Sequence, residues 1–454
     1  MPRPINPQLS FKEKVAYGLG DSASNFFFQF FGLFGVYYYT DIFNLSPAFV
    51  GTMILVVRMF DAVLDPAIGI LADRTETRWG KFRPFILWGA IPYAVFGYLM
   101  FLNPALGPGG REIYACATYT LVWVAYSFIN IPYSALLGVI SPSSTERASV
   151  SSIRFTCAFA ATALIGWGTV PMKNWLGHGN DATGMRTTML IFSVVAAVLF
   201  LVSFAGTRER VKPPAQKSDL KRDLADLARN RSWVILVVLG LVLLIAIGLR
   251  NAMNIYYFKY LVGSETGVAT FNLYGFLAFI AGTTMTPLLL KYADGRTWLT
   301  ILYIAVGLVW CSFYLLDPKT QFGWVMGLNI LANFIAGPQP ALLWAMYADC
   351  ADFGEWKFGR RTTGLVFSSA VFSQKAGGAI GGALIGWVLE ALKFTANHVQ
   401  TAGADRGMLV LFSLAPGVLS VATGLLVVFY PLTRKLMAEI EGDLAARKGA
   451  AAAI

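Results

Sequence analysis

Three charged residues interrupt an apolar run that is long enough to cross a membrane. Arg58, Asp61 and Asp65 stand at positions i, i+3 and i+7 within the run from about residue 47 to 72, so they share one stripe of a helix. Each charge costs about 2.5–3.5 kcal/mol at the centre of a membrane helix, even on lenient insertion scales. Such residues are expected to have a function.

An ion pair between Arg58 and one aspartate is the structural interpretation of this stripe, but it neutralises only one of the two carboxylates. Two acids one turn apart repel each other where the dielectric constant is low, so at least one must be protonated or must recruit a cation. The stripe therefore predicts a site that exchanges a proton or binds sodium. A cation-coupled transporter needs such a site.

Basic residues also lie within other apolar runs. Lys375, in "VFSQKAGG", is about 12 residues from either end of its predicted helix, so its side chain cannot easily reach the membrane surface. We expect it to point into a watery or anionic cavity. Arg154, in "SSIRFT", and Arg250 lie nearer to a predicted helix end, where reaching the surface is the alternative.

The remaining buried polar residues would suit a ligand with many hydroxyl groups, or an anionic sugar. Asp21 and Asn25 share a helix face at i, i+4 in "GLGDSASNFF", and Asn130 lies in "YSFINIPYS". Sugar sites combine such groups with an aromatic platform. Aromatic residues make up 14% of the chain, so packing is the alternative role for each candidate ring. The candidate platforms are Tyr126, Tyr133 and Trp344.

Membrane helices must position these residues. Of the 454 residues, 56% are hydrophobic and only 13% are charged, whereas soluble proteins carry about 25% charged residues. The apolar residues form blocks of about 20 or more, the length that crosses a hydrocarbon core of about 30 Å. The predicted spans are 15–40, 47–72, 84–103, 112–141, 149–172, 187–206, 233–259, 266–290, 298–316, 322–348, 363–392 and 407–431. The sequence thus predicts an all-α membrane protein.

The basic residues follow the positive-inside rule. With both termini inside, the cytoplasmic segments hold 25 of the 36 Lys and Arg, and the outer loops, Lys173 among them, hold 7. The net charge of +11 therefore reports orientation in the membrane and not a nucleic-acid partner. We expect a multi-pass protein of the bacterial inner membrane, surrounded by lipid, with cytoplasmic termini and no cleavable signal peptide.

Nothing in the sequence favours an enzyme. The four cysteines fall in or at the ends of spans, and His178 and His398 stand alone in predicted outer loops, so neither a disulfide framework nor a metal site is indicated. The sequence contains no nucleophile elbow, P-loop or zinc-binding spacing. We expect no enzyme and no cofactor besides a coupling cation.

A long hydrophilic connection, "TRERVKPPAQKSDLKRDLADLARNR", divides the spans six and six. The predicted domains are a six-helix bundle at 1–206, a cytoplasmic linker at 207–232, a six-helix bundle at 233–431 and a cytoplasmic tail at 432–454. Leucines at helical spacing in "SDLKRDLADLARN" predict a short amphipathic helix in the linker; a flexible linker is the alternative.

Weak repetition between the halves supports this division. "GILADRTETRWGK" and "LLLKYADGRTW" both place an acid and a base in the tight loop after the second span of a half. Transporters built from two repeated bundles have this signature. The glycines of "KAGGAIGGALIG" predict close helix packing, and "AGPQPALLW" predicts a break in the tenth span because its prolines cannot donate backbone hydrogen bonds.

The chain resembles the glycoside–pentoside–hexuronide:cation symporter family of the major facilitator superfamily. The matching stretches are "YGLGDSASNF", "YYYTDIF", "VGTMILVVRMFDAVLDP", "TRWGKFRPFIL", "YSFINIPYSAL", "ADCADFGEWKFGRRTTGL", "QKAGGAIGG" and "FYPLTRK". They occur in order from Tyr17 to Lys435, and "RWGKFRPF" and "ADCADFGEWK" are specific to this family. The resemblance implies twelve helices in two bundles and sugar transport coupled to a cation.

The resemblance also implies a cation site. Asp61 and Asp65 match its carboxylates, Ser127 matches a hydroxyl ligand, and Arg58 lies beside them. The sodium-coupled melibiose permeases have an asparagine where this chain has Leu64, so a sodium ligand is missing. A proton needs no coordination shell, and proton coupling is therefore favoured over sodium coupling.

The family's sugar site implies the substrate-binding residues. Two of its carboxylates are replaced by Asn25 and Asn130, whereas Arg154 and Lys375 match its basic positions, so the site should admit an acidic glycoside. A neutral pentoside or disaccharide is the alternative. The complete predicted set is Asp21, Asn25, Tyr126, Asn130, Tyr133, Arg154, Trp344, Gln374 and Lys375.

A transporter of this family is expected to rock between outward-facing and inward-facing states. Cytoplasmic charges in "RWGKFRP" and "DFGEWKFGRR" would hold the inner side shut in the outward-facing state. A sugar receptor that does not transport is the second, less favoured hypothesis. The predicted gating residues are Asp73, Arg74, Arg78, Lys81, Arg83, Asp349, Asp352, Glu355, Arg360 and Arg361.

Overall fold

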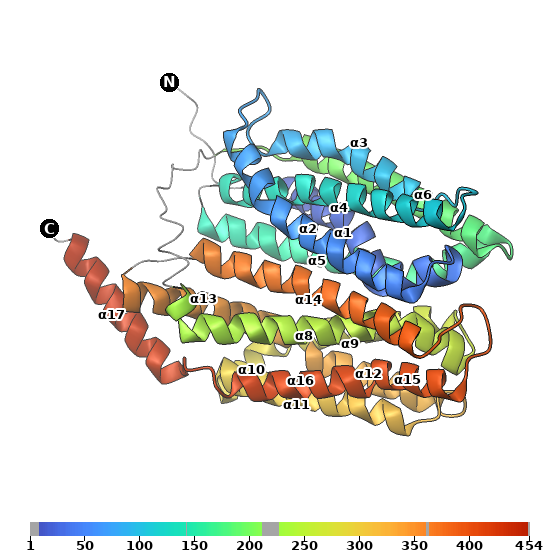
Figure 1. Ribbon diagram of the computed structural model, residues 1–454. Coiled ribbons are helices and arrows are strands. Elements are labelled where there is room, and N and C mark those ends of the chain that lie inside the picture. The colour runs from blue at the N-terminus through green and yellow to red at the C-terminus, as the bar shows by residue number, and fades with distance from the viewer. Residues whose placement is uncertain (1–8, 142, 211–226, 360–362, 453–454) are drawn as a thin grey trace. The chain divides into compact units, whose positions relative to one another are not determined.

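The computed structural model describes residues 9–141, 143–210, 227–359 and 363–452 (Figure 1). This part of the chain is helical, with one isolated bridge between Thr77 and Gly80. It forms two compact units. Unit 1 comprises Met1–Ala215, Ser264–Asn272 and Gly386–Val399, and unit 2 comprises Gln216–Gly263, Leu273–Ile385 and Gln400–Ile454.

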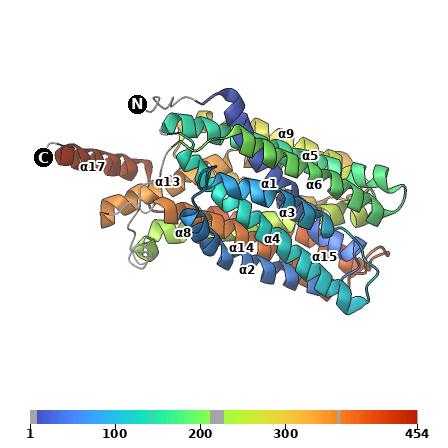
Figure 2. The ribbon, with the colours of Figure 1, turned by 90° about the horizontal axis from the view of Figure 1, so that it is seen from above.

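The first half of the chain supplies six long helices that run side by side in unit 1 (Figures 1 and 2). Each one covers a predicted span. They are α1 (Phe11–Tyr37), continued by η1 (Tyr38–Ile42), α2 (Pro47–Arg74), α3 (Arg83–Leu99), α4 (Pro108–Val139), α5 (Ser144–Gly177) and α6 (Asp181–Gly206).

The second half again covers six predicted spans, but several of its helices are broken. The breaks fall between α9 and α10, α12 and α13, and α15 and α16. The helices are α8 (Arg231–Tyr256), continued by η2 (Tyr257–Val262), α9 (Gly267–Thr283), α10 (Thr286–Tyr292), α11 (Gly295–Ser312), continued by η3 (Phe313–Leu315), α12 (Phe322–Ala336), α13 (Gln339–Phe358), α14 (Thr363–Ala391), α15 (Ala402–Phe412), α16 (Leu414–Val427) and α17 (Arg434–Ala452).

Twelve membrane spans account for this arrangement, as the sequence predicted. Within the described residues, six helices are individually long and apolar enough to cross a membrane, and the pair α9–α10, bent by 46°, makes a seventh. The other spans are shorter, are broken or, like α2, carry charges at mid-span. The predicted break in the tenth span is also found, because α12 ends at Ala336 and α13 begins at Gln339, after Pro338.

Small residues let the helices of unit 1 approach closely. A Cβ atom on Gly18 of α1 would lie 2.8 Å from the sulfur of Cys157 on α5, and one on Gly20 would lie 2.6 Å from the ring of Tyr133 on α4. The residue between them and the functional Asp21 is therefore pressed against α4 and α5. In unit 2 the glycines of "KAGGAIGG" pack α14 on α8, since a Cβ on Gly377 would lie 2.7 Å from Leu244.

The first helices of the two halves end alike, which supports the internal repeat. Both finish in a π-helical turn, η1 in "YYTDI" and η2 in "YFKYLV", closed by an i+5 backbone hydrogen bond. Each turn is followed within two residues by a left-handed residue, Asn44 with φ 58° and Gly263 with φ 81°.

Arg250 does not reach the membrane surface. Its guanidinium lies over Trp310, Phe313 and Phe412, at 5.2, 4.5 and 4.3 Å from the ring centroids, and its side chain is buried. Its Nη1 donates to the carbonyl oxygen of Phe412 at 2.8 Å. That carbonyl has no helical donor, because the residue four positions later is Pro416.

Two sequence-based placements need comment. Lys173 was expected in an outer loop, but it lies within α5 and is completely buried, because α5 extends to Gly177. The predicted amphipathic helix of the linker falls mostly outside the described residues. At the C-terminus, α17 packs on α13: Met437 and Ile440 are buried, and the indole nitrogen of Trp356 donates to Asp443 at 2.8 Å.

Candidate functional site

Asp61 is the most deeply buried of the predicted cation-site residues. Its side chain on α2 is 1% exposed, and the hydroxyl of Ser127 on α4 donates to its Oδ1 atom at 2.5 Å. Asp65 follows one helical turn later and is half-buried. Pro66 lies inside α2 and has no N–H, so the carbonyl of Ala62, between the two acids, lacks its helical donor. The structure thus brings Asp61 and Ser127 together, as predicted.

Aromatic rings hold Arg58. Its guanidinium carbon lies 3.1 Å from the ring centroid of Trp123 and 5.5 Å from that of Phe28. Its Nη1 atom has no hydrogen-bond acceptor among the described residues. A guanidinium stacks favourably on an indole face when water is excluded. Trp123 was not recognised from the sequence, because a buried tryptophan in an aromatic-rich helix gives no signal of its own.

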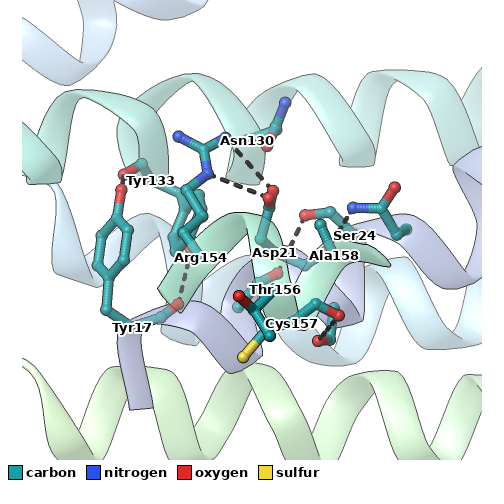
Figure 3. Close-up of polar contacts among 12 residues, drawn as sticks. Tyr17, Asp21, Ser24, Asn130, Tyr133, Arg154, Thr156, Cys157 and Ala158 are labelled. Atoms are coloured by element: carbon teal, nitrogen blue, oxygen red, sulfur yellow. Dashed lines mark hydrogen bonds and ion pairs between the residues drawn. The ribbon is translucent and has the colours of Figure 1, made fainter. Parts of the chain in front are cut away.

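Asp21 and Arg154 form an ion pair at the centre of unit 1 (Figure 3). Arg154 Nε lies 3.1 Å from Oδ2 of Asp21, and Nη2 lies 3.3 Å from Oδ1, a two-pronged geometry that fixes both side chains. The guanidinium also lies 5.3 Å from the ring of Tyr133. Arg154 therefore turns inward instead of reaching the membrane surface.

Tyr133 is packed behind this pair. Its ring stacks on that of Tyr17 at 4.6 Å between centroids, and each hydroxyl donates to the other residue's backbone carbonyl, at 2.6 and 3.0 Å. Both tyrosines are fully buried. The structure thus places Tyr133 beneath Arg154, where it supports the arginine, and leaves its hydroxyl committed to the backbone.

Asn130 and Asn25 lie close to the ion pair. Asn130 donates to the hydroxyl of Tyr126 at 3.1 Å, while its Oδ1 atom accepts no hydrogen bond within the described part of the chain. Asn25 donates to the backbone oxygen of Asp21 at 2.8 Å and accepts from Gln29 at 3.2 Å. Figure 3 shows Asn130 beside the Asp21–Arg154 pair. Asn130 thus offers a buried oxygen that a ligand hydroxyl could fill.

A short aromatic path joins the two clusters of unit 1. Tyr126 stacks on Phe28 at 5.8 Å and meets Trp123 edge-on at 5.2 Å, and Arg58 lies over Trp123. Asn130 is bonded to the other end of Tyr126. A change in charge at the α2 carboxylates can therefore reach the polar cluster through packed side chains.

Unit 2 contains the other three predicted substrate residues. Lys375 on α14 is 8% exposed, so it is buried as expected, whereas its neighbour Gln374 is exposed. Trp344 on α13 is half-buried, with its ring 6.0 Å from that of Tyr347. No group of three or more His, Cys, Asp or Glu in the described residues could hold a metal ion.

Arg83, one of the predicted gating residues, is bonded within unit 1. It donates to the backbone oxygens of Trp79 at 3.1 Å and Phe204 at 2.7 Å. The loop before it is held by Glu209, whose carboxylate accepts the N–H groups of Lys81, Phe82 and Arg83 at 2.9, 2.7 and 3.0 Å. Glu209 was missed because its sequence context shows only a charged linker.

The other predicted gating residues have varied surroundings. Arg74 is exposed and Arg78 lies 4.3 Å over the ring of Trp79. Asp73 lies in the last turn of α2, while Arg360 and Arg361 lie outside the described residues. The half-buried acids of α13 are Asp349, Asp352 and Glu355.

Solved structures with the same fold are membrane transporters. A nucleoside transporter, NupG, matches with a TM-score of 0.60 and 15% identity over 92% of this chain and 99% of that chain. A structure titled for substrate recognition in proton-dependent oligopeptide transporters matches with a TM-score of 0.66 and 12% identity, over 92% and 98%. The fold is that of the major facilitator superfamily.

Sequence comparison is more specific. A family model described as MFS/sugar transport protein matches residues 16–434. The inner membrane symporter YicJ of Escherichia coli is 34% identical over 97% of this chain and 96% of its own length. The isoprimeverose transporter of Lactiplantibacillus pentosus is 34% identical over 94% and 91%, and the glucuronide carrier protein homolog of Escherichia coli is 30% identical over 98% and 97%. The chain belongs to the glycoside–pentoside–hexuronide:cation symporter family of sugar transporters.

Proposed function

We propose that the protein is a proton-coupled symporter that carries a sugar glycoside, pentoside or hexuronide inward across the inner membrane by alternating access. The single observation that carries this proposal is the burial of Asp61 against the hydroxyl of Ser127. A carboxylate 1% exposed within a membrane helix is costly when charged, so binding a proton stabilises it and losing the proton to water resets it.

The contact supports a proton better than sodium. A hydroxyl can donate to a charged carboxylate and can accept from a protonated one, so the Asp61–Ser127 contact serves both states. Sodium would need several oxygen ligands, and Leu64, beside Asp65, contributes none. Protonation of the α2 carboxylates would then change sugar affinity through Arg58, Trp123 and Tyr126 by a coupling free energy of about 1–3 kcal/mol.

The sugar is proposed to bind at Asn130, Asn25 and the Asp21–Arg154 pair. The free Oδ1 atom of Asn130 and the outer edges of the ion pair offer both acceptors and donors to hydroxyl groups. Because Asp21 offsets the charge of Arg154, this cluster favours a neutral sugar over a uronide. A uronide would depend on Lys375. The isoprimeverose transporter and the glucuronide carrier homolog among the relatives support sugar as the substrate class.

Replacing Asp61 tests the coupling. Asp61→Asn, reconstituted in liposomes, should exchange labelled sugar across the membrane but should not accumulate it against a gradient when a proton gradient is imposed. The matched control is Asp317→Asn, which removes an exposed loop acid. The panel contains a neutral methyl glycoside and a methyl glucuronide, each at two pH values with and without sodium.

Three results would redirect the proposal. Normal uphill accumulation by Asp61→Asn would refute the coupling role. Accumulation driven by sodium alone would establish the alternative, a sodium-coupled symporter of neutral disaccharides. Sugar binding by the wild-type protein without any exchange would identify a receptor.

A further inference from the structure

Two short segments from the second half of the chain belong to unit 1, at its predicted outer end. They are Ser264–Asn272, which includes the first turns of α9, and Gly386–Val399, which includes the end of α14. Their contacts with the helices of the first half involve none of the residues of the predicted sugar and cation sites.

Glu265 fastens the first of these segments. Its carboxylate lies 3.0 Å from Nζ of Lys173 on α5 and accepts the hydroxyl of Tyr37, at the end of α1, at 2.7 Å. Lys173 is completely buried and also lies 2.7 Å from Asp181, the first residue of α6. The buried ammonium is thus shared between a carboxylate of the segment and one of its own neighbouring helix.

This sharing makes the contact reversible. A buried ammonium stripped of every counter-charge would cost several kcal/mol, which would lock a simple ion pair shut. When Glu265 withdraws, Lys173 keeps Asp181, which is 48% exposed and so remains hydrated. Opening therefore leaves no isolated buried charge. The hydrogen bond of Tyr37 to Glu265 adds strength only in the closed state.

The second segment is held by close backbone approach. A Cβ atom on Gly386 would lie 2.2 Å from the backbone oxygen of Pro47 and 2.8 Å from the Cα of Gly51, so only glycine fits there. Next to it, the indole nitrogen of Trp387 donates to the hydroxyl of Thr52 at 3.0 Å. Both contacts reach the first two turns of α2 and are lost if the segment moves away by even a few tenths of a nanometre.

We propose that these two segments form an outer latch, made of the Tyr37–Glu265–Lys173–Asp181 cluster and the Gly51–Gly386 contact. The latch releases from unit 1 when the sugar site opens to the outside, and the Lys173–Glu265 pair sets how readily it does so. The inference rests on the proposed function insofar as a transporter must open its site to that side.

Labelling of a buried cysteine in the segment tests the latch. Val268, which is 0% exposed in the first segment, is replaced by cysteine after the four native cysteines have been removed. A membrane-impermeant maleimide is then applied from outside. Glu265→Gln keeps the side-chain shape but loses the charge, and Gly386→Ala wedges the second contact apart; each should raise the labelling rate at least threefold.

The control lies on the same helix as the wedge. A Cβ on Gly378 of α14 would meet no atom within 4 Å, so Gly378→Ala should label at the parent rate. Parent-like labelling of both Glu265→Gln and Gly386→Ala would overturn the latch. The readout needs no sugar and no gradient, so it separates this proposal from the symport proposal. If labelling rises while Asp61→Asn still accumulates sugar, the latch stands and the coupling assignment fails.

Discussion

The two arginines buried in the middle of unit 1 are stabilised by different means. Arg154 is paired with the carboxylate of Asp21, whereas Arg58 lies against the rings of Trp123 and Phe28. A paired arginine keeps its neighbour charged. An arginine held by rings leaves the nearby carboxylates of α2 free to change protonation state without breaking an ion pair of Arg58. This difference fits a structural role for Arg154 and Asp21 and a coupling role for Asp61.

The Asp21–Arg154 pair should show strong mutual dependence. Asp21→Asn or Arg154→Gln alone leaves one buried charge without its partner, and each should lower unfolding stability by about 3 kcal/mol. The double variant should lose less than the sum of the two single changes, with a coupling of about 1–3 kcal/mol. Thermal unfolding of the four purified proteins in detergent measures this cycle. Strictly additive losses would show that the pair contributes nothing jointly.

Glu146, at the start of α5, should make the attachment of the N-terminus sensitive to acid. The backbone N–H of Leu9 and the ammonium of Lys14 hold the pKa of this carboxyl below its ordinary value of 4.5. Because the pKa is lower in the folded state, the attachment is complete above about pH 4.5 and is lost as the pH falls through the depressed pKa.

Proteolysis of the N-terminal segment across pH 3–6 with an acid-tolerant protease measures this attachment. Wild-type protein should become cleavable only at the acid end. Glu146→Gln should be cleaved at all pH values, and a pH-independent wild-type protein would contradict the assignment.

The chemistry-bearing residues could be found from the sequence, but their partners could not. Charge inside an apolar run identifies Asp61 or Lys375, because the cost of burial is the same wherever the chain folds. The pairing of Asp21 with Arg154 joins residues 133 positions apart, and nothing in either local sequence encodes it. Trp123 and Glu209 were missed for the same reason, since their roles exist only through tertiary contacts.

At the scale of elements, the start of α3 depends on an acid from the end of the first half. Glu209 accepts three consecutive N–H groups before the helix, where the left-handed Gly80, with φ 108°, turns the chain. Glu209→Gln replaces one acceptor oxygen with a donor and should destabilise unit 1 by about 2 kcal/mol. Amide exchange at residues 81–83 should accelerate, while Glu76→Gln, which alters an exposed acid of the same loop, should change nothing. Unchanged exchange in Glu209→Gln would refute the capping role.

The break between α15 and α16 should depend on Arg250 only as long as Pro416 is present. Arg250→Met removes the donor to the carbonyl of Phe412 and should lower stability by about 1–3 kcal/mol. Pro416→Ala restores a backbone N–H at the helical position, so the second change should recover part of the loss. Unfolding temperatures of the two single variants and the double variant measure this. If Pro416→Ala brings no recovery, the arginine acts through ring packing alone.

The sequence predicted long helices better than it predicted how they end. Length and apolarity determine a span, and prolines in "AGPQPALLW" correctly predicted the break before Gln339. The π-helical ends of α1 and α8 depend on hydrogen bonds that shift by a single residue, which no periodicity reveals. Lys173 was misplaced because a cation near a span end is typical of a loop, and only the carboxylates around it allow its burial within α5.

At the scale of the whole molecule, the distribution of Lys and Arg predicts the orientation. With 25 of 36 basic residues in the loops assigned to the cytoplasm, both termini should lie inside. A fluorescent protein fused after Ile454 should therefore fluoresce, and alkaline phosphatase inserted after Lys319 should be active outside the cytoplasm. The opposite pair of signals would invert the topology and would place the latch on the cytoplasmic side.

The π turns at the ends of α1 and α8 have a consequence for deletions. Each turn fits one more residue than an α-helix of the same length would, as the hydrogen bond from Phe43 N–H to the Tyr38 carbonyl shows. Deleting one residue from either turn would relax it to an ordinary helix and rotate everything beyond by about 100°. A one-residue deletion there should thus spoil export to the membrane or folding, whereas the same deletion in the loop 103–107 should be tolerated.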